Sequence, residues 1–471
     1  MEIITFSVLA MTIWLVIWKI ACRGPLSWAS PAALFAGGLI TFYVFPSLYW
    51  QFRPWNYLIP SYFDGLPIVL LGTLGLAPAF LWASLFEQRK HCPPKPLLIR
   101  SADNTIKRRV WVLLVPCAIG MAWHLYLITL GYQERFVRQT PTLFGSDTLA
   151  FLVGNVAYYY PVCYFGLVGF GNPFTRRVGQ AVWLLDAFLT IITLHRYAIL
   201  VFLARSVIFL TILGWRPQWR HKVVALGVVL ITVGVLGESS SAANEVKLYE
   251  KAYLGPRQVF EVLLQSATRY LNRDTSPGWS SSAADPLIGL VDDTMYRLYD
   301  ARSASAVMAA IPDVIPYYHG ATFQHILYSL IPRYFWENKP AARDIHVITT
   351  QVMPGDLGVN PLGTVAEFYL NFGYVGILLG GLVCWLLCRA VDSAMIGGGR
   401  FGPAWICFYP ILAEMLFASN FNFTQRVMEA LHGLIVLVAL NSFFRRPAMR
   451  AQLAQRAAFR RWRRRSVPVA S

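Results

Sequence analysis

The segment SLIPRYFWENKP, residues 329–340, places two cations beside three aromatic side chains. Arg333 and Lys339 can bind phosphate oxygens, and an arginine can do so through two parallel hydrogen bonds. Tyr334 and Trp336 can stack on sugar rings or anchor at a membrane interface, because their rings are apolar and their edges polar. An interfacial belt accounts for the aromatic residues but not for the cations. The segment therefore predicts a site that handles a charged ligand.

Other ionisable side chains could serve the same chemistry as anion ligands or as an acid or base. They lie in a long polar segment or at the edges of apolar runs: Arg196, Arg297, Arg302, His319, His346 and Glu367. An arginine on an exposed helix can instead pair with a nearby carboxylate, as Asp293 and Arg297 could. Ionisable groups within apolar runs, such as Asp186 and Arg205, are costly in hydrocarbon, so function and mutual pairing are both open roles. Arg205 falls near the middle of its run and is predicted to be a buried ion-pair partner.

Metal and nucleotide chemistry is not indicated by the spacing of these residues. The histidines of HGATFQH lack the H-E-x-x-H spacing of a zinc site, and the chain contains no G-x-x-x-x-G-K-[ST] phosphate loop. None of the seven cysteines lies in the long polar segment, so no disulfide is predicted there. We expect neither a metal nor another cofactor.

The elements that must position these groups are apolar helices. The chain is 56% hydrophobic and only 14% charged, which is too apolar for an ordinary soluble domain. Apolar runs long enough to cross a bilayer recur along most of it. The first run has no basic leader, so we expect a span there and not a cleaved signal. The sequence predicts an all-α polytopic membrane protein with about 11 spans (10–12), near residues 2–20, 29–50, 65–86, 110–131, 149–170, 178–195, 197–215, 223–240, 371–390, 402–420 and 427–444.

The positive charge of the chain, formally +17, is concentrated in short segments between the predicted spans and in the C-terminal tail. Retention of Lys and Arg on the cytoplasmic side explains this distribution without nucleic acid, and contact of the tail with anionic lipid is compatible with it. Threading the spans through the membrane puts the N-terminus outside and the C-terminus in the cytoplasm.

One long segment departs from this pattern. Residues 237–362 hold 13 of the 24 acidic residues but only 10 of the 41 basic ones. Such a balance indicates a loop on the outer face, which in a bacterium is the periplasm, and its amphipathic stretches predict a helical cap. The expected organisation is an N-terminal bundle of about eight helices (1–240), a large periplasmic loop (241–362), about three C-terminal spans (363–444) and a basic cytoplasmic tail (445–471).

Two stretches, YYHGATFQHILYSLIPRYFWENKP and NPLGTVAEFYLNFGYVGILLGGLV, together resemble the Wzy-type polymerases of O-antigen and exopolysaccharide repeat units. The local match runs over roughly 70 residues, Tyr317 to Val383, and the architecture extends it along the chain. The resemblance implies a GT-C-like glycosyltransferase of the bacterial inner membrane. Its substrates would be oligosaccharides linked to undecaprenyl diphosphate, and a chain-length regulator and a flippase of the same pathway would be its partners.

The resemblance also implies roles for the candidate residues. Arg196, Arg302 and Arg333 match diphosphate-binding positions best, with Arg297 and Lys339 in support. Glu367 is the first choice for a general base, and His319 and His346 are weaker choices. Tyr334 and Trp336 are candidates for sugar contact.

Three alternatives stay open. An O-antigen ligase shares the donor and the architecture, but ligases tend to carry a His-Asn pair, and this chain has none. A flippase or transporter for lipid-linked sugars would explain the spans but would not need so long an outer loop, and it commonly shows internal repeats. A non-catalytic assembly component would use the loop as a docking module.

Overall fold

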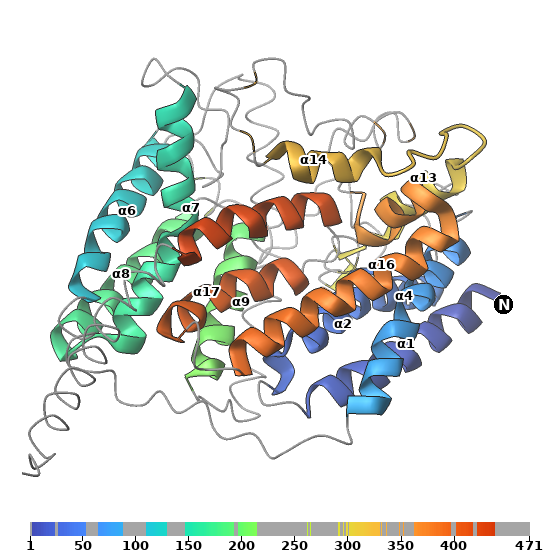
Figure 1. Ribbon diagram of the computed structural model, residues 1–471, viewed down its shortest axis with the longest axis horizontal. Coiled ribbons are helices and arrows are strands. Elements are labelled where there is room, and N and C mark those ends of the chain that lie inside the picture. The colour runs from blue at the N-terminus through green and yellow to red at the C-terminus, as the bar shows by residue number, and fades with distance from the viewer. Residues whose placement is uncertain are drawn as a thin grey trace, which may run out of the picture.

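The computed structural model describes residues 2–23, 27–52, 65–87, 110–129, 147–192, 196–213, 301–329, 362–396, 402–417 and 422–438, with isolated positions between 261 and 352. Within these residues every regular element is a helix and none is a strand (Figure 1).

The helices of the N-terminal half follow one another with short connections where both ends are described. They are α1 (Glu2–Ala21), α2 (Pro31–Leu39), α3 (Phe45–Gln51), α4 (Leu66–Glu87), α6 (Leu114–Thr129), α7 (Asp147–Phe170), α8 (Pro173–Ile192) and α9 (Arg196–Ile212). A single π-helical segment, Ile40–Val44, joins α2 to α3, so the three form one continuous rod. Ser30 starts this rod, because its hydroxyl accepts a hydrogen bond from the Ala33 amide at 3.3 Å and Pro31 follows it.

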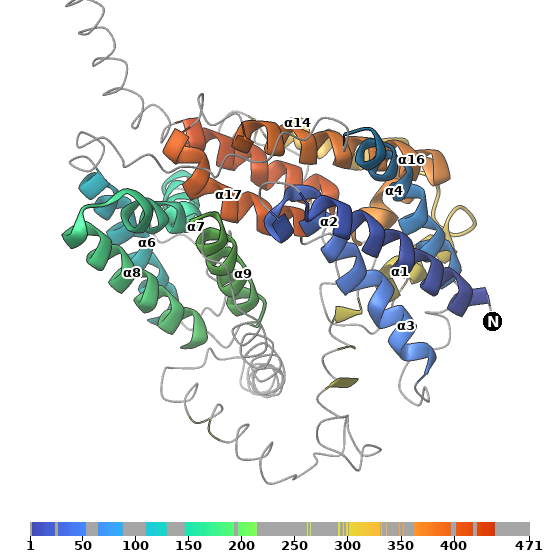
Figure 2. The ribbon, with the colours of Figure 1, turned by 90° about the horizontal axis from the view of Figure 1, so that it is seen from below.

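The C-terminal half contributes α13 (Ala301–Ala310), α14 (Ala321–Ser329), α16 (Thr364–Ile396) and α17 (Gly402–Phe417). A further helix runs over residues 423–438, and we refer to it as the C-terminal helix. Figures 1 and 2 show α6, α7 and α8 gathered at one side of the molecule and α1, α3 and α4 at the other. Two hydrophobic cores correspond to these sides, one built on α1, α2, α4, α13 and α16 and the other on α6, α7, α9 and α17.

Glycines allow α4 and α16 to cross at close range. A Cβ atom at Gly381 would lie 2.6 Å from the carbonyl oxygen of Leu76, and one at Gly72 would lie 2.7 Å from the Val365 side chain. Small residues of this kind let helix backbones approach in a membrane protein, where packing replaces the hydrophobic effect. The α4–α16 contact therefore fixes the start of α16 against the first core.

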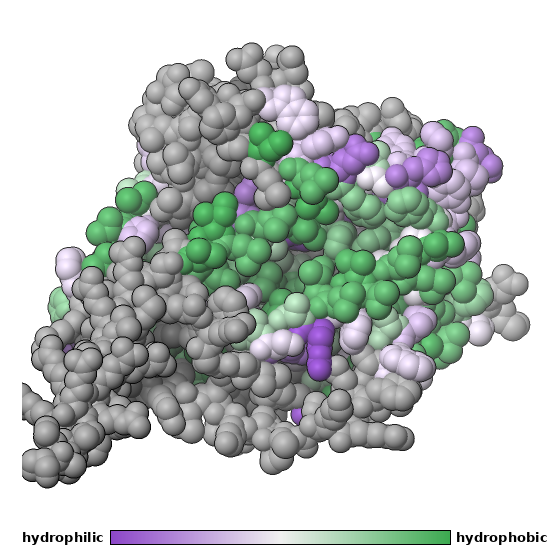
Figure 3. All heavy atoms as spheres, in the orientation of Figure 1, coloured by the Kyte–Doolittle hydropathy of each residue, from purple (hydrophilic) through white to green (hydrophobic). Residues whose placement is uncertain are grey.

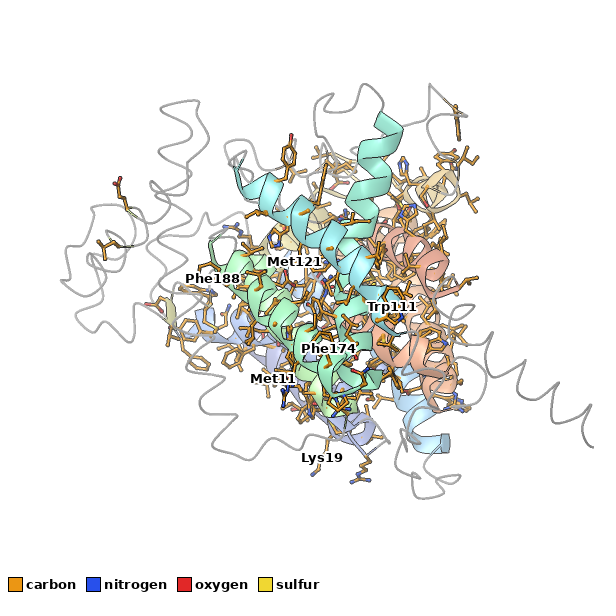
Figure 4. The ribbon with its side chains drawn as sticks, turned by 90° about the vertical axis from the view of Figure 1, so that its left-hand side faces the viewer. Met11, Lys19, Trp111, Met121, Phe174 and Phe188 are labelled. Carbon is orange, nitrogen blue, oxygen red and sulfur yellow. The ribbon has the colours of Figure 1, made fainter. Side chains whose placement is uncertain are left out.

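The outer surface of the helices is apolar, as expected for a membrane-associated protein. Three helical stretches in the described part are long and apolar enough to cross a membrane: Ile3–Ala21, Pro31–Gln51 and Thr364–Ala394. A continuous band of hydrophobic side chains runs across α16 and the C-terminal helix (Figure 3). On the side formed by α6 and α8, Trp111, Phe174 and Phe188 are likewise exposed (Figure 4).

Helices occur at ten of the eleven predicted spans, and the eleventh, 223–240, lies outside the described residues. The prediction that 178–215 contains two helices matches α8 and α9. The number of membrane crossings, the orientation and the GT-C-like fold stay predictions. The start predicted at residue 371 differs from the structure, because α16 begins seven residues earlier, at Thr364. Those residues include Glu367, whose charge lowers the hydropathy just before the predicted span.

The described part of the long polar segment contains α13 and α14, and α13 packs closely against other helices. The position of this segment relative to a membrane stays a prediction. Seven of the ten residues of α13 are buried, and four of them belong to the core that contains α4 and α16: Ala301, Ala304, Val307 and Met308. A Cβ atom at Gly65, just before α4, would lie 2.0 Å from the Ser305 carbonyl oxygen. The small side chains of ARSASAVMAA explain this close docking, since alanine and serine leave room for a neighbouring backbone.

Candidate functional site

A break in α16 is the centre of the candidate site. Phe372 (φ −145°, ψ 19°) and Gly373 (φ 61°, ψ −145°) leave the helical conformation, so α16 consists of a half-helix, residues 364–371, and a long segment, 374–396. Glycine suits position 373, because residues with a side chain rarely adopt its positive φ. The half-helix folds back onto the long segment, and Gly376 and Gly380 make room for Phe368. These two glycines, four residues apart, thus accommodate the other half of the same helix.

The carbonyl groups at the end of the half-helix are satisfied by a loop at 316–320. The amides of Tyr318 and His319 donate to the carbonyl oxygens of Leu370 and Asn371 at 2.9 and 3.1 Å. The Gly320 amide donates to Oδ1 of Asn371 at 2.9 Å. Irregular backbone in a membrane protein needs such partners, because lipid offers none. The loop and the half-helix therefore form one hydrogen-bonded unit.

Asn371 extends this unit toward α14. Its side chain is fully buried, and Nδ2 donates to the hydroxyl of Thr322 at 2.7 Å and to the carbonyl oxygen of Glu367 at 2.8 Å. With the bond from Gly320, the Asn371 side chain uses both its donor nitrogen and its acceptor oxygen. Burial of this amide therefore leaves neither atom without a hydrogen bond.

Glu367 joins the half-helix to the C-terminal helix. Its carboxylate is fully buried and accepts hydrogen bonds from the hydroxyl of Thr424 and, at 3.1 Å, from the Thr424 amide. A carboxylate at a helix N-terminus satisfies amides that lack a helical partner and complements the helix dipole. Nearby, the Leu362 amide donates to Oδ1 of Asn422 at 2.9 Å. Both oxygens of Glu367 are thus engaged, which favours a positioning role over direct contact with a substrate.

Four rings border the open side of this unit, and we refer to them as the aromatic row. His319 is exposed and has a left-handed backbone (φ 47°), and its ring centroid lies 6.5 Å from that of Tyr317. Tyr317 lies 6.2 Å from Tyr369, which lies 5.3 Å from Tyr374. Tyr374, the first residue after the break, is 51% exposed.

The predicted site residues are partly brought together. His319 and Glu367 lie at opposite ends of the network that runs through Asn371. Arg302 is half-buried on α13, and Trp336 packs on Tyr328 of α14 with centroids 5.2 Å apart. Arg196 is the first residue of α9, but its side chain is outside the described atoms. The other predicted residues lie outside the described part of the chain: Arg297, Arg333, Tyr334, Lys339 and His346.

Sequence reasoning missed the polar residues that join the three segments. Thr322, Asn371 and Thr424 are all buried and carry the network. For Asn371 a signal was available, since it directly precedes the Phe-Gly dipeptide at which the helix breaks. Thr322 and Thr424 give no comparable signal, because a threonine in an apolar helix commonly bonds to its own backbone.

A second set of buried charges holds α9, α17 and the C-terminal helix together. Nη2 of Arg205 lies 3.0 Å from Glu414, and Nη1 of Arg426 lies 3.7 Å from Glu414 and 2.7 Å from Glu429. This confirms the predicted ion-pair role of Arg205. The four groups balance in charge, so their burial avoids the high cost of a lone ion.

Asp186 has a similar structural setting among α6, α7 and α8. It is fully buried, accepts hydrogen bonds from the hydroxyls of Tyr160 and Tyr164, and lies 3.4 Å from Nδ1 of His124. This pairing decides between the two roles left open by the sequence in favour of a contact within the bundle. In the described residues, no three metal-ligating side chains converge here or elsewhere.

Residues 293–449 match a family described as a domain of unknown function, DUF8712. The match covers α13, α14, α16, α17 and the C-terminal helix, which contain the whole network around the break. No curated protein and no solved structure matches the chain.

Proposed function

We propose that the protein is a membrane glycosyltransferase that joins oligosaccharide repeat units carried on undecaprenyl diphosphate at the periplasmic face of the bacterial inner membrane. The observation that carries this proposal is the docking of loop 316–320 on the half-helix through two backbone hydrogen bonds. The loop and the half-helix belong to the two stretches that resemble Wzy-type polymerases. Their contact supports a shared role for both stretches at the point where the chain enters a long apolar helix.

In the proposed reaction, an acceptor sugar hydroxyl attacks the anomeric carbon of the donor glycan. The oxygen–carbon bond forms, the bond from the anomeric carbon to the lipid diphosphate breaks, and the hydroxyl proton passes to a base. Neither a nucleotide nor ATP is consumed, because the diphosphate already activates the donor. The leaving group gains negative charge, which fixed cations can stabilise in a site that excludes water.

The geometry supports His319 as the group that takes the proton. Its imidazole is exposed beside the break, and histidine is the side chain that most often transfers protons in general acid–base catalysis. Glu367, with both oxygens bound by Thr424, holds the half-helix in place. Arg302 supports the diphosphate assignment, since α13 packs in the same core as the half-helix. Arg196, Arg297, Arg333 and Lys339 complete the proposed cation set, and the proposed partners are a chain-length regulator and a flippase.

The test replaces His319 by asparagine in a strain that lacks the chromosomal copy. Asparagine tolerates the left-handed backbone at this position, and the bond to Asn371 comes from the backbone amide, so the docking is retained. The matched control is Leu378→Ala, an exposed position on the apolar face of the long segment. We expect His319→Asn to accumulate exported lipid carriers with a single repeat unit, while Leu378→Ala makes polymer of normal length.

Gel profiles of the polysaccharide and of its lipid-linked precursors in these strains separate the alternatives. Unchanged polymer length in the deletion strain would reject the proposal. Long polymer retained on the lipid would indicate a ligase, and single units trapped on the cytoplasmic face would indicate a flippase. Normal polymer in His319→Asn, with polymer absent from the deletion strain, would reject only the role of His319.

A further inference from the structure

The aromatic row is held rigidly by its own contacts. Tyr317 meets Tyr369 at an interplanar angle of 63°, and Tyr369 meets Tyr374 at 78°, both edge-to-face arrangements that aromatic rings favour. A Cβ atom at Gly373 would lie 3.3 Å from the Tyr317 hydroxyl, so the glycine of the break lets Tyr317 approach the backbone. Within the row Tyr369 is buried, whereas His319 and Tyr374, at the two ends, are exposed.

The chemistry of the exposed surface changes at Tyr374. The next exposed side chains along the long segment are Val375, Leu378 and Leu379, which have no polar atoms and suit contact with lipid chains. The row instead offers apolar ring faces edged by hydroxyl groups and an imidazole. A pyranose ring has the matching features, an apolar face of C–H groups and a rim of hydroxyls.

The row is also unsuited to the diphosphate of the proposed substrate. Its members carry no permanent positive charge, and the cations assigned to the diphosphate are other residues. A neutral ligand with ring faces therefore fits the row better than an anion or a hydrocarbon chain does.

We infer that Tyr317 and Tyr374, supported by Tyr369 and flanked by His319, form a stacking platform for a neutral sugar ring of the oligosaccharide. This inference rests on the proposed function and adds to it a contact for the glycan separate from the diphosphate. The platform holds an acceptor sugar beside His319, so that a hydroxyl of that sugar can reach the imidazole.

The experiment measures binding of a free glycan to the full-length protein in nanodiscs. The probe is a mixture of oligosaccharides released by mild acid from the surface polysaccharide of the producing cell. Saturation-transfer NMR, with irradiation of aromatic protein protons, reports which sugar C–H groups lie against rings. We expect transfer to one face of a sugar in the wild type and in Tyr374→Phe, which keeps the ring.

Tyr374→Leu keeps an apolar side chain at the lipid interface but removes the ring. We expect it to weaken glycan binding about threefold to tenfold, the size of one stacked aromatic contact. Leu378→Ala is the control and should bind as the wild type does. Melting temperatures verify folding, and if Tyr374→Leu fails to fold, His319→Asn tests the other end of the row, where weaker binding is again expected.

Equal binding by the wild type and Tyr374→Leu would overturn the inference and leave the tyrosines as interfacial anchors. Absence of transfer in the wild type would overturn it as well. If binding depends on the Tyr374 ring but the deletion strain makes polymer of normal length, the stacking platform is supported and the proposed polymerase function is rejected. Loss of polymer in the deletion strain, with equal binding by both proteins, would reject the platform alone.

Discussion

Replacing Asn371 by leucine should weaken the docking of loop 316–320 on the half-helix, although the two backbone bonds remain. The substitution keeps the branched shape of the side chain and its number of heavy atoms but removes three hydrogen bonds. The Thr322 hydroxyl, which accepts the bond from Asn371, keeps its own hydrogen bond to the Glu367 carboxylate, and the Glu367 carbonyl keeps its helical partner. The Gly320 amide, however, loses its acceptor. A net hydrogen bond contributes about 1 kcal/mol and an orphaned buried donor costs about 1–3 kcal/mol, so we expect a loss of about 2–4 kcal/mol in the free energy of unfolding.

Unfolding can be followed by titration with a denaturing detergent or by heating with a thiol-reactive dye. The dye is suitable because five of the six cysteines in the described residues are buried in helices: Cys117, Cys163, Cys384, Cys388 and Cys407. Thr322→Val is the matched control, since it removes only one of the three Asn371 bonds, together with the bond of its hydroxyl to Glu367, and should cost about 1–2 kcal/mol.

The double variant Asn371→Leu/Thr322→Val should lose less stability than the sum of the single variants, because both remove the same bond. An unfolding free energy of Asn371→Leu within about 0.5 kcal/mol of the wild type, the range of ordinary surface substitutions, would refute the reasoning. Full additivity of the two substitutions would show that Asn371 and Thr322 act independently.

Three further substitutions test the packing and the buried charges by the same unfolding measurement. Gly381→Ala should lose about 1–3 kcal/mol, because its Cβ atom meets an α4 carbonyl oxygen at 2.6 Å, whereas Gly169→Ala, with neighbours no closer than 3.6 Å, should be neutral or stabilising; equal effects would contradict the close crossing of α4 and α16. Arg205→Met should lose about 3–5 kcal/mol by leaving a buried carboxylate in excess, and adding Glu414→Met should recover part of that loss; a further loss in the double variant would contradict the charge balance. Asp186→Asn should lose about 1.5–3 kcal/mol, since two tyrosine hydroxyls bond to the carboxylate; an unchanged melting temperature would show that these bonds do not stabilise the bundle.

The positions of the helices could be predicted because length and hydropathy determine them. Runs such as Ile3–Ala21 are long and predominantly apolar. A chain segment in hydrocarbon forms a helix, because its backbone groups must then bond to one another. The start of α16 was misplaced for the same physical reason, since Glu367 is acceptable in the helix only through the amide and hydroxyl of Thr424, which are far away in sequence. A local measure of hydropathy cannot contain those partners.

The candidate site was predictable only in part. His319 and Glu367 were predicted as acid–base candidates from their residue types, and both belong to the network at the break. Their roles depend on exposure and bonding, which the sequence does not contain: Glu367 is fully buried against Thr424, whereas His319 faces outward. The packing of α13 in the core could not be predicted either. A short helix rich in Ala and Ser has the same sequence pattern on a surface as between helices.

The bond between Glu367 and Thr424 has a consequence for the biosynthesis of the protein. The two residues are 57 positions apart, and α17 lies between them. When the ribosome has just completed the half-helix, the amide and hydroxyl that will bind its carboxylate have not yet been synthesised. The carboxylate therefore lacks these two hydrogen bonds until the C-terminal helix has been synthesised. A nascent chain that stops after Phe417 contains the half-helix but neither of these two donors.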